Sequence, residues 1–280
     1  MQVFRHVAEL MRWRNANRQL SVGFVPTMGA LHNGHISLIK KAKSDNPLVI
    51  CSIFVNPTQF NDADDLKHYP RSPEQDLIML ETAGCDAVFM PDEAEMYGSR
   101  PQLQLYFGDL EKVMEGAHRP GHFNGVGLVV SKLFHMVQPD YAYFGQKDLQ
   151  QFLIIKRLVT DLSFPVTLVC CPIVREPDGL AMSSRNMRLN PTARKQAPAL
   201  YRALTEAKER ITKGEHPLSV CKEIAKRLNE TGHFSVEYLV LADTENLSEV
   251  SQPQVGQEYA LCIAAFLDNV RLIDNLVFRM

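Results

Sequence analysis

One run of residues limits the possible folds of this chain more than any other. Residues 48–55 are almost entirely apolar, and the run is short enough for a single strand. Such a run is typical of a strand buried on both faces of a parallel sheet, because a strand with one face in water alternates apolar and polar residues. Parallel strands need crossover connections, usually helices, so the neighbouring segments should alternate between strand and helix.

The first 175 residues show that alternation. Repeated strand–helix–strand units predict an α/β fold built on a Rossmann-like, doubly wound parallel sheet. We expect strands at 22–25, 48–55, 86–90, 141–144 and 166–171, and helices at 35–43, from 73 to about 84, 126–137 and 147–161. Ser72 and Pro73 should begin the second of these helices, as its N-cap and its first helical residue.

The pattern changes after Arg175. Residues 176–179 (Glu-Pro-Asp-Gly) have turn chemistry. Beyond them we expect a long helical stretch at 191–213, a helix at 219–229 and three β-type runs at 236–241, 259–266 and 270–273. Because 280 residues exceed the usual size of one domain, two domains are expected. Residues 1–175 would form the Rossmann-like domain, and residues 176–280 a smaller C-terminal α+β domain.

Charge and cysteine usage exclude several classes of protein. With 30 basic and 32 acidic residues the formal net charge is −2, so a dedicated nucleic-acid binder is not expected. No stretch approaches the ~18 uncharged apolar residues of a membrane span, and the N-terminus lacks a signal-peptide pattern. Six scattered cysteines without a Cys-x-x-Cys pair predict buried free thiols in a reducing cytosol. We therefore expect a cytoplasmic protein.

Two histidines follow the first predicted strand of the sheet. Ligands bind beyond the carboxyl ends of parallel strands, and His32 and His35 lie there, three residues apart on one face of a helical first turn. Gly34 between them lets a ligand approach the backbone. The unpaired amides and positive end of a helix N-terminus favour phosphate, and two imidazoles can donate hydrogen bonds to it as charge develops.

Taken singly, these histidines have other interpretations. One histidine alone is more often a satisfied polar residue at a helix start, and zinc would need a third ligand that the nearby sequence does not offer. The full string His32-Asn33-Gly34-His35, however, resembles the HxGH signature of class I adenylyl-transferring enzymes. Those enzymes pair the signature with a mobile, basic, serine-containing loop late in the sheet, and residues 182–186 lie where that loop would fall.

Polar residues also follow other predicted strands. Lys147, after the strand at 141–144, can place a positive charge on phosphate, and Gln151 lies one turn further on the same helix face. Gln59 follows the strand at 48–55 and offers a donor and an acceptor to a small polar substrate. A solvated Lys147, a helix-capping Asp148 and a turn-stabilising Gln59 are the structural alternatives.

Seven strings spread over essentially the whole chain resemble the pantothenate synthetase (pantoate–β-alanine ligase) family. They lie at 25–35, 52–60, 69–71, 119–126, 144–148, 178–186 and 271–275. The resemblance implies a C–N bond-forming ligase that makes pantothenate from (R)-pantoate, β-alanine and ATP. Pantoate would attack the α-phosphate of ATP to give pantoyl adenylate and pyrophosphate, and β-alanine would then displace AMP. The resemblance also implies Mg²⁺ on the ATP phosphates, a homodimer, and a C-terminal domain that acts as a lid.

The same resemblance implies roles for individual residues. His32, His35, Lys147 and Arg185 are the expected catalytic residues, with His35 at the proton-donor position. The expected contacts to ATP are Met28, Gly29, Ala30, Leu31, His32, Asn33, Gly34, His35, Gly145, Gln146, Lys147, Asp148, Val174, Met182, Ser183, Ser184 and Arg185. The expected contacts to pantoate or β-alanine are Gln59, Gln151, Met28, Phe54 and Tyr69. No metal ligand is assigned, because Gln146 stands where many relatives carry Glu, and Gln75 where some carry a second acid.

Two rival functions remain to be tested, and the sequence argues against a third. Another class I nucleotidyltransferase would release pyrophosphate but keep the nucleotide in a stable product. A non-catalytic nucleotide sensor would bind ATP without turnover. A tRNA-binding relative would need a basic surface and an anticodon-recognition domain, and the sequence offers neither. Separately, the glycine-containing segment 119–127 is either a flexible gate over the pocket or an ordinary surface loop.

Overall fold

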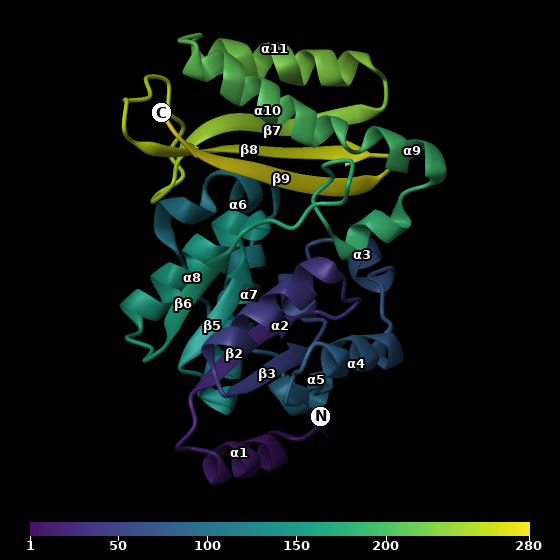
Figure 1. Ribbon diagram of the computed structural model, residues 1–280, viewed down its shortest axis with the longest axis vertical. Coiled ribbons are helices and arrows are strands. Elements are labelled where there is room, and N and C mark those ends of the chain that lie inside the picture. Colours follow the sequence, from purple (N-terminus) through teal and green to yellow (C-terminus); the bar gives the residue numbers. More distant parts are fainter. The chain divides into compact units, whose positions relative to one another are not determined.

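The computed structural model describes residues 1–280, which divide into two compact units (Figure 1). The first unit comprises residues 1–146 and 151–172, and the second comprises residues 147–150 and 173–280. The second unit is therefore discontinuous in the sequence, because a short piece of chain directly after residue 146 belongs to it.

A six-stranded sheet, all of whose strand pairs are parallel, forms the centre of the first unit. Its strands are β1 (Gln2–Phe4), β2 (Val22–Thr27), β3 (Leu48–Ile53), β4 (Ala87–Phe89), β5 (Tyr141–Gly145) and β6 (Thr167–Cys171). Their order is β1-β4-β3-β2-β5-β6, so β1 lies at one edge, and the later strands extend from β2 first toward β4 and then toward β6. This order confirms the doubly wound, Rossmann-like fold and places its topological switch point between β2 and β5.

The apolar run at residues 48–55 forms β3, in the interior of this sheet. β3 pairs with β2 on one side and β4 on the other, and Val49, Ile50 and Cys51 have no exposed surface. A strand with neighbours on both edges and cover on both faces has no solvent-facing row of side chains, which explains why the run does not alternate.

Helices and short turns connect the strands. They are α1 (Val7–Ala16), α2 (Asn33–Asp45), η1 (Pro57–Gln59), α3 (Ala63–Lys67), α4 (Pro73–Thr82), α5 (Glu93–Tyr97), η2 (Gly108–Glu111), α6 (Met114–His118), α7 (His122–Val137), η3 (Gln146–Asp148) and α8 (Leu149–Asp161). The predicted helices correspond to α2, α4, α7 and α8. Strand β1 and the helices α1, α3, α5 and α6 were not predicted, and all but α1 have five residues or fewer, too short to show a clear period.

Helix α7 begins four residues before its predicted start, and this removes one hypothesis. His122, Phe123 and Gly125 are buried within it. A Cβ atom on Gly125 would lie 2.3 Å from the carbonyl oxygen of Thr58, so this glycine allows two backbones to pack closely. The prediction of a flexible gate or a surface loop at 119–127 is therefore wrong for residues 122–127.

The second unit contains an antiparallel sheet of three strands, covered on one face by two helices (Figure 1). The strands are β7 (Phe234–Asp243), β8 (Glu258–Leu267) and β9 (Val270–Arg279), and the helices are α10 (Ala199–Thr212) and α11 (Pro217–Glu230). The other elements are η4 (Ser184–Arg188) and α9 (Pro191–Gln196). The predicted helix at 191–213 is thus two helices, because Pro198 has no N–H with which to continue α9. Strand β9 runs six residues beyond its predicted end, since Asp274 and Asn275 interrupt the apolar pattern there.

Five of the six cysteines are buried free thiols, as predicted, but Cys170 is exposed. Burial raises the pKa of Cys85 to about 12 and that of Cys221 to about 11, so these thiols stay protonated near neutral pH. No helix in the structure combines the length and the apolar character needed to cross a membrane.

Candidate active site

The first part of the site is the turn between β2 and α2. Gly29 and Ala30 both have left-handed backbone conformations, with φ of +80° and +50°. Asp76, in the first turn of α4 and 1 % exposed, holds this turn. Its Oδ2 accepts the amide of Ala30 at 2.9 Å and its Oδ1 accepts the amide of Leu31 at 2.7 Å. Ser72 occupies the predicted N-cap position, but its hydroxyl donates to Asp76 Oδ1 at 3.2 Å instead of accepting an amide. Asp76 was not among the site residues predicted from the sequence.

His32 and His35 form a reciprocal cap at the start of α2. His32 is the N-cap residue, and its Nδ1 accepts the amide of Gly34 at 3.1 Å. Nδ1 of His35 accepts the amide of His32 at 3.4 Å, and the two ring centroids lie 4.1 Å apart. The amide of His35 donates to the carbonyl of His32 at 2.8 Å. The expectation of unpaired amides for phosphate is therefore wrong for Gly34 and His35.

The same cap determines which nitrogens of the two imidazoles carry protons. A ring nitrogen that accepts an amide hydrogen bond is unprotonated, so each neutral ring carries its proton on Nε2. His32 and His35 therefore present Nε2–H donors from adjacent rings. Two such donors suit an oxygen on which negative charge develops, so the phosphoryl chemistry predicted for this segment depends on side chains more than on helix amides.

Gln59, a predicted substrate residue, is buried in the turn η1 that follows β3. Its Nε2 lies 2.9 Å from the sulfur of Met28, and its Oε1 accepts Asn56 Nδ2 at 3.2 Å. The structure thus brings Met28 and Gln59 together from the ends of two neighbouring strands. Phe54 lies in the same region, with its amide donating to the carbonyl of Thr27 at 3.1 Å. Tyr69 packs edge to face on Phe60, the residue after Gln59, with centroids 5.7 Å apart.

Asn56 organises the polar contacts around Gln59 and is itself only 1 % exposed. Besides Gln59, its Nδ2 donates to the carbonyl of Gly125 at 3.1 Å. Its Oδ1 accepts the hydroxyls of Tyr97 at 2.6 Å and of Thr58 at 3.0 Å. Burial raises the pKa of Tyr97, so its hydroxyl stays protonated and able to donate. With its donors and acceptors matched, this buried amide holds η1 against the start of α7.

The backbone of Gln59 is held by residues of the segment predicted as a possible gate. Nδ1 of His122 lies 2.7 Å from the carbonyl oxygen of Gln59, and Arg119 Nη2 donates to the same oxygen at 3.4 Å. Arg119 Nη1 lies 3.2 Å from His122 Nε2. Because its Nδ1 faces a carbonyl, neutral His122 carries its proton there and accepts from Arg119 at Nε2. Arg119 and His122 therefore position Gln59.

The two strands at the switch point are joined over a short distance. β2 pairs with β5 at Gly23 and Phe24, whereas it pairs with β3 as far as Thr27. Pro26 has no N–H and cannot donate to a ladder. The carboxyl ends of β2 and β5 are therefore not joined, at the place where open α/β sheets bind ligands. Gly145 ends β5, Gln146 follows it, and Gln151 lies in the first turn of α8.

The remaining predicted ATP contacts belong to the second unit. The carbonyl of Val174 accepts the amide of Met182 at 3.0 Å, and Arg175 pairs with Ala181, so residues 174–182 form a hairpin. Ser183 caps η4, with its Oγ accepting the amide of Arg185 at 3.3 Å, and the side chain can still donate its own proton. Ser184 is buried. Lys147 also lies in this unit, with Nζ 3.6 Å from Asp148 Oδ1. No group of three or more His, Cys, Asp or Glu side chains is arranged to hold a metal ion.

Known proteins resemble this chain along its whole length. The family model described as pantoate-beta-alanine ligase matches residues 2–277. The pantothenate synthetases of Cytophaga hutchinsonii and Porphyromonas gingivalis are 48% and 46% identical, over 99% and 100% of this chain and 96% and 100% of theirs. The crystal structure of pantothenate synthetase from Thermus thermophilus has a TM-score of 0.91 at 45% identity, covering 99% of both chains. Pantoate-beta-alanine ligase from Francisella tularensis, complexed with beta-gamma ATP and beta-alanine, has a TM-score of 0.84 at 37% identity, covering 99% of this chain and 97% of that one.

Proposed function

The chain belongs to the pantoate-beta-alanine ligase family, and from that premise we propose that it condenses (R)-pantoate with β-alanine, using ATP. The products are pantothenate, AMP and pyrophosphate. The observation that carries the proposal is the pair of Nε2–H donors on His32 and His35, which the reciprocal cap orients at the carboxyl end of β2. The Francisella tularensis relative, whose structure holds beta-gamma ATP and beta-alanine, supports two of the three substrates.

In the first step, a carboxylate oxygen of pantoate attacks the α-phosphorus of ATP. The bond from that phosphorus to the bridging oxygen of pyrophosphate breaks, leaving pantoyl adenylate. His32 and His35 donate hydrogen bonds to phosphoryl oxygens as charge develops, with His35 in the family's proton-donor position. Lys147 and Arg185 balance the charge of the departing pyrophosphate, together with the hydroxyls of Ser183 and Ser184. No protein nucleophile is needed, because the substrate carboxylate performs the attack.

Pantoate is assigned to the residues gathered at the end of β3. Gln59 offers an amide to its polar groups, and Met28 and Phe54 offer apolar surface to its geminal methyl groups. Gln151 and Tyr69 complete the proposed contacts. The contact of Met28 with Gln59 and the anchoring of Gln59 by His122 and Arg119 support this assignment, since an oriented buried amide can select a small hydroxy acid.

In the second step, the amine of β-alanine attacks the carbonyl carbon of pantoyl adenylate, the carbon–oxygen bond to AMP breaks, and the amine loses a proton. The same two imidazole donors are suited to the AMP phosphate as it leaves, because it carries the charge they accommodated in the first step.

Magnesium belongs to the proposal as an ion carried on the ATP phosphates, where it would neutralise their charge. The chain offers no cluster of carboxylates or imidazoles that would serve as a dedicated cage for it. We also propose that the protein is a cytoplasmic homodimer and that residues 176–280 act as a lid, as the family resemblance implies. The other ATP contacts predicted from the sequence remain part of this proposal.

An assay of AMP formation tests the function. AMP should appear only when both pantoate and β-alanine are present, and pantoate alone should support exchange of labelled pyrophosphate into ATP. A nucleotidyltransferase would keep its nucleotide in a stable product, and a sensor would bind ATP with no exchange. AMP release that does not depend on both acids would refute the assignment.

A further inference from the structure

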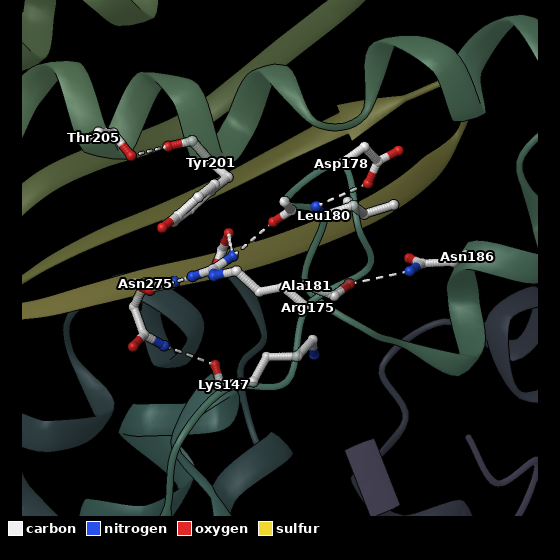
Figure 2. Close-up of polar contacts among 11 residues, drawn as sticks. Lys147, Arg175, Asp178, Leu180, Ala181, Asn186, Tyr201, Thr205 and Asn275 are labelled. Carbon is white, nitrogen blue, oxygen red and sulfur yellow. Dashed lines mark hydrogen bonds and ion pairs between the residues drawn. The ribbon is translucent and has the colours of Figure 1, made fainter. Parts of the chain in front are cut away.

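A buried ion pair in the second unit lies outside the proposed ATP contacts (Figure 2). Arg175 donates from Nη1 to Asp274 Oδ2 at 2.6 Å and from Nη2 to Oδ1 at 2.9 Å, and the Asp274 side chain is 3% exposed. Desolvation raises the pKa of Asp274, and the bonds from Arg175 oppose that rise. Because removing two charges from water offsets most of their attraction, such a pair adds little net stability. Its two parallel bonds do, however, hold both side chains in one orientation.

Arg175 also holds the hairpin from which the Ser183–Arg185 turn extends. Its Nη1 donates to the carbonyl of Gly179 at 3.1 Å, and its guanidinium lies 3.8 Å from the centre of the Tyr201 ring on α10 (Figure 2). Gly179 has φ of +94°, and a Cβ atom there would lie 2.6 Å from the Tyr201 ring. The hairpin is therefore fixed between α10 and β9. Ser183 directly follows Met182, whose amide makes the last hydrogen bond of the hairpin.

Lys147 is fixed by the residue next to Asp274. Asn275 Nδ2 donates to the carbonyl oxygen of Lys147 at 3.0 Å, as drawn in Figure 2. The backbone of Asn275 is held in turn, because its carbonyl accepts Arg175 Nη2 at 3.1 Å and its amide donates to Asp274 Oδ1 at 2.7 Å. A bond to the carbonyl of Lys147 restrains the Cα from which its ammonium group extends. Asp274 and Asn275 on β9 thus anchor both the hairpin and Lys147.

We propose that Asn275 is a positioning residue for adenylation. Through the carbonyl of Lys147 it sets where the ammonium group stands relative to the Ser183–Arg185 turn, and the Arg175–Asp274 pair holds that turn to the same strand. The inference rests on the proposed contact of Lys147 with the ATP phosphates. It links Asp274 and Asn275 to Lys147 and to the Ser183–Arg185 turn, although these residues lie far apart along the chain.

A double-mutant cycle tests the proposal. Asn275→Leu keeps the number of heavy atoms and the branching of the side chain but removes the donor. We expect pantoate-dependent pyrophosphate exchange to lose on the order of 10-fold or more in kcat/KM for ATP, since small displacements of a positioned group are costly. In a Lys147→Ala background the carbonyl persists but the ammonium is gone, so Asn275→Leu should then cost less than about 2-fold. A purely structural role would lower activity by the same factor in both backgrounds.

A second ion pair on β9 provides the matched control. Arg271 Nε donates to Glu237 Oε2 at 2.6 Å, and both side chains are similarly shielded, at 17% and 18% exposed. This bond does not involve Lys147, Arg175 or Asn275, so Glu237→Gln should keep the exchange rate of the wild type. If Asn275→Leu does not fold, the isosteric Asn275→Asp repeats the cycle.

Two results would overturn the inference. One is a wild-type exchange rate in the folded Asn275 variant, and the other is an equal loss in the presence and absence of the Lys147 ammonium. A wild-type protein that shows no pantoate-dependent exchange would instead overturn the proposed function.

Discussion

Replacing His32 separates the two functions that the cap geometry assigns to it. Its Nδ1 accepts the amide of Gly34 at the start of α2, and its Nε2–H is the proposed donor to the phosphoryl group. Asparagine is among the best N-cap residues, so it can replace the first function, but its side chain is too short to place a donor where Nε2 stands. Alanine replaces neither. The bond from the amide of residue 32 to His35 uses the backbone and is available to both variants.

The expected magnitudes follow from these contacts. His32→Ala should lose the cap, about 1 kcal/mol, which lowers the midpoint of thermal unfolding by about 2–4 °C in a unit of this size. His32→Asn should unfold at the temperature of the wild type. Both variants lose one donor to a developing oxyanion, so both should lose pantoate-dependent pyrophosphate exchange by about 100-fold to 1,000-fold, or roughly 3–4 kcal/mol.

Circular dichroism during heating measures the first quantity, and exchange of labelled pyrophosphate into ATP measures the second. The difference in unfolding temperature between His32→Ala and His32→Asn reports the cap. The loss of exchange in both variants relative to the wild type reports the donor. Equal unfolding temperatures for the two variants would refute the capping role. Wild-type exchange in His32→Asn would refute the donor role.

Three further predictions concern the support of the site. Gly125→Ala should cost about 3 kcal/mol in urea unfolding, because its Cβ would lie 2.3 Å from the Thr58 carbonyl oxygen; a stability equal to wild type would contradict this close packing. Asp76→Asn turns one acceptor into a donor that faces an amide of the 29–31 turn. We therefore expect the free energy of unfolding to fall by about 2–3 kcal/mol and pyrophosphate exchange to slow. An unchanged exchange rate would argue against Asp76 as support for the histidines. The pKa of Cys85 is raised to about 12 from the usual 9.0, so the unfolded chain loses this thiol proton at lower pH than the folded chain does. The free energy of unfolding should therefore fall as pH rises from 9 toward 12. Urea unfolding of Cys85→Ala should show a flatter pH dependence in that range.

The sheet was predictable because its signal lies within short windows of sequence. β3 is an apolar run without alternation, and α7 and α8 have enough length to show helical periodicity. Strand β1 and helix α5 escaped detection because three and five residues cannot establish a period. The end of β9 was misplaced for a different reason, since Asp274 is a buried charge whose partner, Arg175, is 99 residues away.

The residues of the candidate site also divide into those with a local sequence signal and those without one. His32 and His35 could be found because their spacing and the intervening glycine form a local motif. Asp76 and Asn56 could not, because each has a partner far along the chain: Asp76 accepts the amide of Ala30, 46 residues away, and Asn56 donates to the carbonyl of Gly125, 69 residues away. Asp76 also has a sufficient local explanation as an acidic residue in a helical first turn, which hides its contact with the Gly29–Leu31 turn. The structure reveals the role of Asp76 through Ser72, the N-cap residue of α4. Ser72 makes no cap bond and donates to Asp76 instead.

The separation of Lys147 from Asn275 has a consequence for how the protein is made. The two residues are 128 positions apart, and a ribosome adds about 5–20 residues per second, so about 6–26 s pass between their syntheses. All six strands of the parallel sheet precede residue 172 and can pair in that interval. Strand β9, by contrast, is the last element of the chain, so its pairing with β8 and its contact with Lys147 must wait until it has been made. A nascent chain can therefore carry its histidine pair on a finished sheet while Asn275 is still missing, so Lys147 gains its proposed anchor only with the last strand.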